Sequence, residues 1–304
     1  MIEISNLTEY QARLHLFVAI EPGASFWGKY LLVNNALETI EKIIAGFEFE
    51  DLPDINKIKT KLQLQEITKL EDVIRSSGGK LLIPTDELWP KQLNDLENPP
   101  IALMAKGNLE NIKYVEQATS IVGTRNPTSY GTRIAEDFAA ALVDRDFSIV
   151  SGGAYGIDAS AHHGALAADG ITCAVLAGGI NQIYPAGNQK LFNQIQNKGI
   201  LISEVMPDVA ALPFRFLIRN RLIAALGKST IVIEAAARSG SIRTATDAAQ
   251  IFRPVFAVPG RISSAQSDGC HRLIADHVAE IVTGVDDVVN LLSPMQLQFD
   301  ETIA

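Results

Sequence analysis

Five short glycine-rich loops, each directly following an apolar segment, constrain the fold of this chain most. The apolar segments read SIVG, FSIVS, TCAVLA, STIVIEA and PVFAVP. Val- and Ile-rich segments without alternation are typical of strands buried on both faces of a parallel sheet. Because glycine at the carboxyl end of such a strand lets the backbone approach a phosphate, these loops predict an anion-binding edge. They occupy residues 123–125, 151–153, 177–179, 237–241 and 259–261.

Strand-like and helix-like segments alternate beyond residue 115. This alternation predicts repeated βαβ units and therefore an α/β fold with a Rossmann-like, doubly wound parallel sheet. We expect strands over 119–123, 147–150, 171–176, 200–203, 229–234, 254–258 and 279–282. We expect helices over 131–145, 156–169, 188–198, 214–226, 241–252, 268–276 and 285–292. Residues 115–293 are thus assigned to one domain, followed by a tail at 294–304.

The amino-terminal part has a different pattern. The segments LTEYQARLHLFVAI and NNALETIEKIIAGF, separated by EPGAS, have apolar residues at helical spacing and predict a small helical domain over residues 1–62. Residues 63–114 are interpreted as a connector of short strands and turns that packs on the core. No apolar run is long enough to span a membrane, and the start lacks a signal-peptide pattern, so we expect a cytoplasmic protein.

Charge is distributed unevenly along the chain. The net charge of −9 argues against a nucleic-acid partner, but residues 211–261 hold eight bases and only two acids. A basic block in an acidic chain indicates a local site for a polyanion. Three of the five glycine-rich loops also carry an arginine, which favours a strand of nucleic acid over a mononucleotide.

Nucleotide-cofactor patterns are absent. The first loop reads GTRNPTSYG instead of GxGxxG, and the second strand ends in Ser151-Gly152 instead of an acid, so a dinucleotide is excluded. The tetrad GKST at 227–230 resembles the end of a P-loop but precedes a strand. We therefore expect no cofactor, and we place Lys228 on a surface turn.

Residues with catalytic or metal-binding chemistry are interpreted as structural. We expect His162 to pack or cap its helix, and we expect Glu204 and Glu234, at two strand ends, to orient arginines. Cys270 and His271 lack two convincing further ligands for zinc, so no metal is expected. The sequence therefore indicates a binding protein and not an enzyme.

The segment PFRFLIRNR at 213–221 and the loop after the next strand are the strongest phosphate-binding candidates. Arg219, Asn220 and Arg221 lie within a largely apolar helix, where a guanidinium must be buried or paired, and Arg suits bidentate phosphate recognition. The segment SGSIR at 239–243, which includes Arg243, begins the next helix with a hydroxyl cap and free backbone amides, which bind anions.

Nearly the whole chain resembles the DNA-processing protein A family. The motifs SIVGTRNPTSYG, SGGAYGIDASAHHGAL, AVLAGGINQIYPAGNQKL, PFRFLIRNRLIAALGKSTIVIEAAARSGSIRTA, FAVPG and SDGCHRLI occur in the order of that family. The resemblance implies a sterile-alpha-motif-like amino-terminal domain and an extended Rossmann-like domain that binds single-stranded DNA without catalysis, with an affinity that depends little on base sequence. It also implies a homodimer that loads a RecA-type recombinase onto DNA during natural transformation. Many members carry a carboxyl-terminal winged-helix domain, and since residues 294–304 are too short to form one, we expect it either to be lacking in this member or to have been cut from the sequence.

The same resemblance assigns the contacts to DNA. Together with the candidates above, the predicted phosphate-binding residues are Gly123, Thr124, Arg125, Ser151, Gly152, Arg219, Asn220, Arg221, Ser239, Gly240, Ser241, Arg243, Gly269 and His271. Tyr155 stands where the family often has arginine, and His271 stands where it has asparagine. We expect Tyr155 and Phe214 to offer stacking surfaces to bases.

Two other classes of function compete with this hypothesis. One is a phosphoribohydrolase of the lysine-decarboxylase-like type, which shares the sheet and the glycine loops but needs PGGxGT and a catalytic glutamate, where this chain has AGGIN. The other is a sensor that binds a mononucleotide in one loop. Titration with an oligonucleotide, ATP and NAD separates the three.

Overall fold

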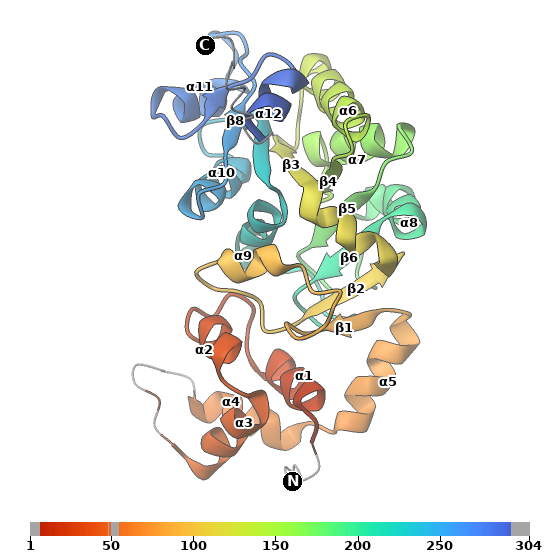
Figure 1. Cartoon of the computed structure of the whole chain (residues 1–304), viewed down its shortest axis with the longest axis vertical. Coiled ribbons are helices and arrows are strands. Elements are labelled where there is room, and N and C mark those ends of the chain that lie inside the picture. Colours follow the sequence, from red (N-terminus) through yellow and green to blue (C-terminus); the bar gives the residue numbers. More distant parts are fainter. Residues whose placement is uncertain (1–6, 48, 50–54, 293–304) are drawn as a thin grey trace, which may run out of the picture.

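The computed structural model, which describes residues 7–47, 49 and 55–292, centres on a nine-stranded sheet (Figure 1). The predicted tail at 294–304 lies outside the described residues. The strand order is β1-β2-β6-β5-β4-β3-β7-β8-β9. The strands are β1 Lys80–Leu82, β2 Leu103–Gly107, β3 Ala118–Gly123, β4 Ser148–Ser151, β5 Thr172–Leu176, β6 Ile200–Ser203, β7 Ser229–Ile233, β8 Val255–Ala257 and β9 Glu280–Ile281.

The sheet reverses its direction of growth at β3. From β3 the chain adds β4, β5 and β6 in parallel on one side, and it then returns to place β7, β8 and β9 in parallel on the other. This arrangement confirms the predicted doubly wound α/β fold. The point between β3 and β7 is the topological switch point, where ligands bind in open α/β sheets. The antiparallel pairs of the described sheet are β1–β2 and β2–β6, at its edge.

Helices cover both faces of the sheet because its inner strands are apolar on both faces. Ile121 and Ile231 pack under α6, α7 and α12, whereas the neighbouring Val122 and Val232 pack under α9, α10 and α11. The helices of this part are α6 Ser129–Val143, α7 Ile157–Ala167, α8 Gln189–Lys198, α9 Pro213–Leu226, α10 Gly240–Gln250, α11 Asp268–Ala275 and α12 Val285–Leu292. All seven were expected from the sequence, with ends that differ by at most three residues.

The amino-terminal helices lie at the β1 end of the sheet (Figure 1). They are α1 Glu9–Ala19, α2 Trp27–Val33, α3 Ala36–Ala45, α4 Ile55–Leu64 and α5 Ile67–Ser77. The two helical segments identified from the sequence correspond to α1 and α3, whereas α2, α4 and α5 were not identified individually. The segment interpreted as a connector of strands and turns therefore begins with a helix, and β1 and β2 of the same segment extend the sheet. Three 3₁₀ segments, Lys91–Asp95, Leu109–Gln117 and Ala186–Asn188, complete the described elements. No helix of these described ranges is long and apolar enough to cross a membrane.

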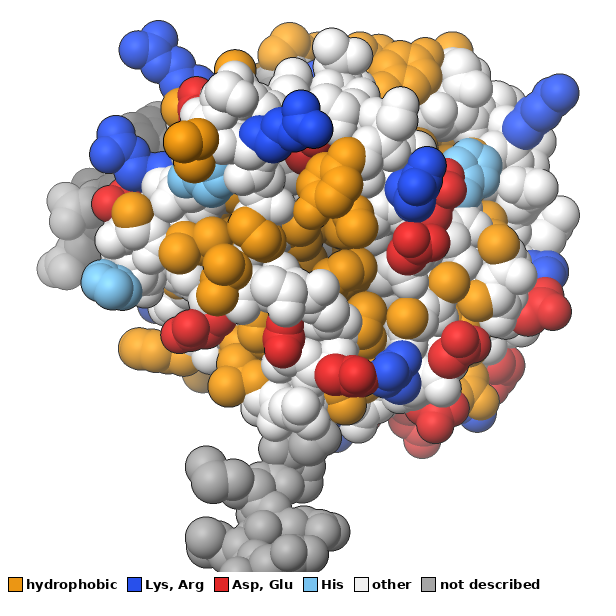
Figure 2. Space-filling model, turned by 90° about the horizontal axis from the view of Figure 1, so that it is seen from above, with side chains coloured by type: hydrophobic (Ala, Val, Ile, Leu, Met, Phe, Trp, Pro, Cys, Tyr) orange, Lys and Arg blue, Asp and Glu red, His pale blue; other side chains and the backbone are white. Residues whose placement is uncertain are grey.

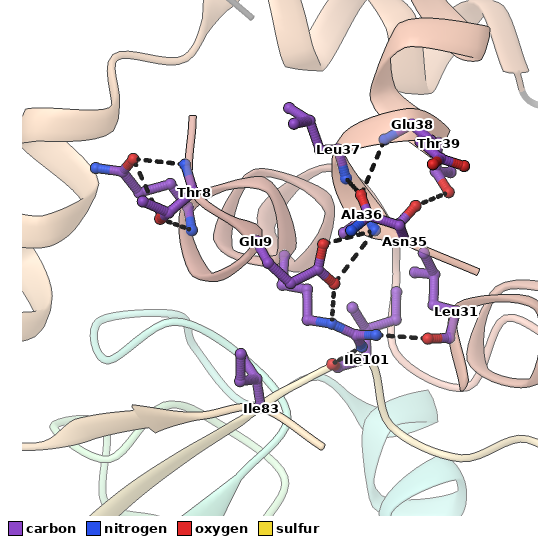
Figure 3. A network of polar contacts seen from close by, with 12 residues as sticks. Thr8, Glu9, Leu31, Asn35, Ala36, Leu37, Glu38, Thr39, Ile83 and Ile101 are labelled. Carbon is purple, nitrogen blue, oxygen red and sulfur yellow. Dashed lines mark hydrogen bonds and ion pairs between the residues drawn. The ribbon is translucent and has the colours of Figure 1, made fainter. Parts of the chain in front are cut away.

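A buried arginine joins the amino-terminal helices to the sheet. The Arg13 guanidinium donates to the Glu9 carboxylate (2.8 Å), to the Leu31 carbonyl (2.5 Å) and to the carbonyl of Ile101, two residues before β2 (3.2 Å). Glu9 also accepts from the Ala36 amide at the start of α3 (2.9 Å), as Figure 3 shows. Because buried charges are stabilised only when they are paired and hydrogen-bonded, this network holds α1, α2, α3 and the strand in one arrangement.

Candidate nucleic-acid interface

A crevice of about 700 Å³ lies at the switch point, beyond the carboxyl ends of β3 and β7. Its walls come from the β3–α6 loop, the start of α7, one side of α9 and the start of α10. Eight of the predicted phosphate-binding residues line it: Gly123, Thr124, Arg125, Arg219, Asn220, Ser239, Gly240 and Ser241. The crevice thus brings together residues separated by more than a hundred positions in the chain.

Helix α10 begins at this crevice with a capped amino terminus. The Ser239 hydroxyl accepts from the Ser241 amide (3.3 Å) and lies 2.7 Å from the Ser241 hydroxyl, as expected for a helix cap. The Asn220 side chain donates to the Gly240 carbonyl (3.2 Å), which joins α9 to this turn. The positive end of the α10 dipole and the cap hydroxyls therefore face the same space as the arginines.

Arg219 lies at the bottom of the crevice and is only 5% exposed. Its guanidinium donates to the Val175 carbonyl, and its Nε has no hydrogen-bond partner among the described residues. Burial lowers the pKa of Arg219 to about 10; the Asp158 charge opposes this shift and the Arg125 charge adds to it. The side chain therefore remains a cation at neutral pH, with donor capacity left for an anion.

Gly152, another predicted contact, makes room for this arginine. A Cβ at position 152 would overlap the Arg219 guanidinium, so the loop after β4 approaches Arg219 as closely as it does only because it has glycine there. Gly152 thus borders Arg219 without lining the crevice.

Asp158 is the carboxylate of the crevice. It lies in the first turn of α7 and is 3.4 Å from the Ala154 amide, which donates to it. Burial raises the pKa of Asp158, and the Arg219 charge opposes this rise. Among the described lining residues, Arg125, Arg219 and Arg238 set three positive charges against this one carboxylate. The crevice is therefore electropositive in a chain whose net charge is −9.

The aromatic side chains at the crevice are not the expected ones. Tyr155 and Phe214 are exposed but do not line it, whereas Tyr184 and Phe216 do. The rings of Tyr184 and Phe216 meet edge to face at 5.4 Å, and the Arg125 guanidinium lies 5.4 Å from the Phe216 ring centre. Phe216 lies three residues before Arg219 and could have been found by following the helical spacing from that arginine.

Five other predicted contacts lie outside the crevice. The Ser151 hydroxyl donates to the Ile121 carbonyl (2.6 Å) within the sheet. Arg221 points away from Arg219 and forms a buried ion pair with Glu204 (2.6 Å), and Arg243 pairs with Asp247 one turn along α10 (2.6 Å). The remaining two, Gly269 and His271, belong to the start of α11: the Gly269 amide donates to the Ala235 carbonyl (2.7 Å), and the His271 ring lies 3.0 Å from the Gly260 carbonyl.

The residues considered for catalysis have structural partners. The His162 ring is buried and hydrogen-bonded to the Thr172 hydroxyl (2.7 Å), and burial lowers the pKa of His162 to about 3, so the ring is neutral. Glu204 holds Arg221, which agrees with its expected role as an orienting partner for arginine. Glu234 instead accepts from the amide and hydroxyl of Thr128, so it orients a helix start and not an arginine. Within the described ranges, no three His, Cys, Asp or Glu residues are grouped so that they could hold a metal ion.

Known proteins resemble this chain in sequence. The family model described as DNA recombination-mediator protein A matches residues 80–293. The putative DNA processing protein DprA of Mycobacterium tuberculosis is 42% identical over 232 residues, which are 73% of this chain and 59% of that protein. The DNA processing protein DprA of Streptococcus pneumoniae is 40% identical over 204 residues, which are 67% of this chain and 71% of that protein. The chain thus spans 59% of the length of the mycobacterial relative.

Solved structures resemble it in fold. The DprA structure from S. pneumoniae superposes with a TM-score of 0.77 at 30% identity, covering 93% of this chain and 98% of that chain. A DprA structure from Helicobacter pylori, described as giving insight into a unique single-stranded DNA binding mode, superposes with a TM-score of 0.63 at 30% identity. That likeness covers 71% of this chain and 97% of the H. pylori chain.

Proposed function

Because this chain belongs to the DNA recombination-mediator protein A family, we propose that it binds single-stranded DNA in the crevice and loads a RecA-type recombinase onto that DNA. Loading would serve recombination and natural transformation. The observation that carries the binding proposal is the convergence of Arg125, Arg219 and Arg238 with the amino terminus of α10 in one crevice at the switch point. The recombinase partner rests on family membership alone.

The shape of the crevice favours a single strand over a duplex. Arg219 is buried in it, between α9 and the loop after β4, and the exposed ring of Tyr184 and the half-buried ring of Phe216 stand at its wall. Phosphates of a flexible strand can reach Arg219 while its bases stack on those rings. A duplex holds its bases inside and would leave the rings unused, so we expect it to bind more weakly.

We also propose that binding proceeds without catalysis. Asp158 accepts from the Ala154 amide and lies in the field of the Arg219 charge, and no serine or cysteine among the described lining residues lies beside a histidine base. The competing sensor function would need tight binding of one mononucleotide. Titration of the protein with a labelled oligonucleotide, ATP and NAD distinguishes these functions, and we expect binding of the oligonucleotide alone.

Replacing Arg125 by Ala is expected to weaken binding to every oligonucleotide about tenfold, because one charge-assisted contact to a phosphate is lost. The slope of log affinity against log salt should flatten by about 0.7, the value for one phosphate of a single strand. Arg125 is exposed, so the thermal unfolding temperature should not change. Fluorescence anisotropy at several salt concentrations measures both quantities.

Lys228→Ala is the matched control for this prediction. The Lys228 ammonium donates to the Gln117 side chain (2.6 Å) before β7, at the opposite end of the strand from the crevice. Its loss removes the same charge without removing a phosphate contact, so affinity and slope should stay near those of the original protein. Unchanged binding by the Arg125 variant, or equal losses in both variants, would contradict the proposed site.

We propose further that the chain forms a homodimer through the end of the sheet at β9. The β9 strand is the outermost strand, and Figure 2 shows that hydrophobic side chains gather on this end of the molecule, with charged side chains around them. Exposed apolar residues of this region include Ile262, Ile281 and Leu291. A large apolar patch of this kind is typical of an interface between proteins.

Ile281→Lys is expected to convert the dimer into a monomer, because it places a charge in the centre of the proposed interface. Light scattering at tens of micromolar should then give half the mass of the original protein. Leu64→Lys, which changes an equally apolar residue that is 80% exposed on α4, should leave the mass unchanged. A monomeric mass for the original protein at that concentration would refute the dimer.

A further inference from the structure

A second cavity, of about 870 Å³, lies on the other side of the β7 end from the crevice. It is formed by the start of α6, by Glu234 and by the loop between β8 and α11, which contains the glycine motif at 259–261. Its lining differs from that of the crevice: Arg261 is the only cation among the described lining residues, beside a carboxylate, an aromatic ring and several hydroxyl groups.

Glu234 is the fixed polar group of this cavity. It is 5% exposed, and its carboxylate accepts from the Thr128 amide (2.8 Å) and from the Thr128 hydroxyl (2.5 Å). Its backbone has φ 49°, a conformation that is costly for a glutamate and that concentrates at functional sites. A carboxylate has about four acceptor positions, so Glu234 can accept from a ligand as well.

Two further groups suit a planar ligand with polar edges. The Tyr130 ring is 48% exposed, and its hydroxyl donates to the Pro259 carbonyl (3.1 Å), which fixes the ring at the cavity wall. Ser267 is only 3% exposed and lines the cavity, so its hydroxyl is a further polar group there beside Glu234. An aromatic face and buried acceptors together recognise a flat ring that carries hydrogen-bond donors.

The charge of the cavity disfavours a phosphate. The Glu234 carboxylate already occupies the amino terminus of α6 through Thr128, where an anion would otherwise bind. A second anion would face that carboxylate at close range. The ligand is therefore a neutral group with donors, and an amino group beside an aromatic ring meets both requirements.

We propose that this cavity binds a nucleobase with an exocyclic amino group, from a nucleotide next to those held in the crevice. The inference rests on the proposed binding of single-stranded DNA. The β3–α6 loop lines both spaces, with Thr124 and Arg125 at the crevice and Thr128 to Tyr130 at the cavity. The Thr124 amide also donates to the Glu234 carbonyl (2.6 Å), so the two spaces share one wall. The base stacks on Tyr130 and donates to Glu234.

The test compares oligo(dC) with oligo(dU) of equal length at pH 8. The two bases have the same size, but cytosine has an amino donor at C4 and an acceptor at N3, whereas uracil has a carbonyl acceptor at C4 and an N–H donor at N3. The original protein should bind oligo(dC) about five- to tenfold more tightly, as expected for one good base contact. Tyr130→Ala, an exposed change that should not affect folding, should reduce the ratio of the oligo(dC) affinity to the oligo(dU) affinity toward one. Tyr130→Phe should keep that ratio because the stacking ring remains. Glu234→Gln should also reduce the ratio, provided that its thermal unfolding is normal.

Arg125→Ala separates this inference from the proposed function. It should weaken both oligonucleotides equally and leave their ratio unchanged, because it acts on the phosphates. A ratio near one in the original protein, or a ratio that Tyr130→Ala leaves intact, would overturn the base-binding cavity while the crevice still binds DNA. Failure of both oligonucleotides to bind at low salt would overturn the proposed function itself.

Discussion

Arg219→Ala is expected to lower the free energy of unfolding by about 1–3 kcal/mol at pH 8, the range for leaving a buried polar group without its partner. The change leaves the Asp158 carboxylate buried without the cation that stabilises its charge. It also leaves the Val175 carbonyl without its donor and opens space beside Gly152. Urea unfolding at equilibrium measures this loss, and DNA binding should fall as well wherever the variant is folded.

The loss of unfolding free energy caused by Arg219→Ala, called the deficit below, should depend on pH. Burial raises the pKa of Asp158 in the folded protein, and the Arg219 charge opposes this rise. Without Arg219, the pKa of Asp158 in the folded variant should therefore be higher than in the original protein. A carboxyl whose pKa is raised on folding stabilises the protein while it is protonated, below its unfolded pKa of about 3.9. That stabilisation is lost as the pH rises through the folded pKa. The deficit of Arg219→Ala relative to the original protein should therefore be smaller at pH 5 than at pH 8.

Asp158→Asn combined with Arg219→Ala is the control for this mechanism. Without the carboxylate, no buried charge is left unpaired, so the double variant should recover part of the loss at pH 8 and show little pH dependence. An equal deficit of the single variant at pH 5 and pH 8 would show that lost packing, and not the Asp158 charge, explains the effect.

Gly123→Ala is expected to destabilise the protein by about 3 kcal/mol, the upper part of the usual range for overpacking. A Cβ at this position would overlap the Ile233 carbonyl oxygen and the Ile157 side chain, so β3 and β7 would have to separate at the switch point. Thermal unfolding measures the loss. Gly240→Ala is the matched control, because the nearest atom to its Cβ would be the Asn220 amide nitrogen at 3.9 Å. Similar losses at both positions would contradict the argument.

The fold was predictable from sequence because its signals are local. Unalternating apolar segments identified the inner strands, and helical spacing between them identified the seven helices of the Rossmann-like part. Thr124, Arg125 and Ser239 line one crevice, as expected for residues that follow parallel strands and meet at one sheet edge, and their contact with DNA stays a prediction. The helix α5 was missed since its weakly apolar sequence becomes helical by packing on the first strands.

The direction of individual side chains was decided only in three dimensions. Arg219 and Arg221 lie two residues apart on α9, a helix with apolar residues around most of its circumference, so spacing could not tell which arginine faces the crevice. Packing of Leu222 and Ile223 on the core sets the rotation of α9, which turns Arg219 into the crevice with Asp158 and brings Arg221 into its ion pair with Glu204. The sequence by itself thus determined the inner strands, the helices between them and the basic loops, because these follow from periodicity, whereas the strand order and its switch point came from the tertiary structure. The tertiary structure decided which cations remain free for a ligand, because each buried charge takes the partner that the packing brings within reach.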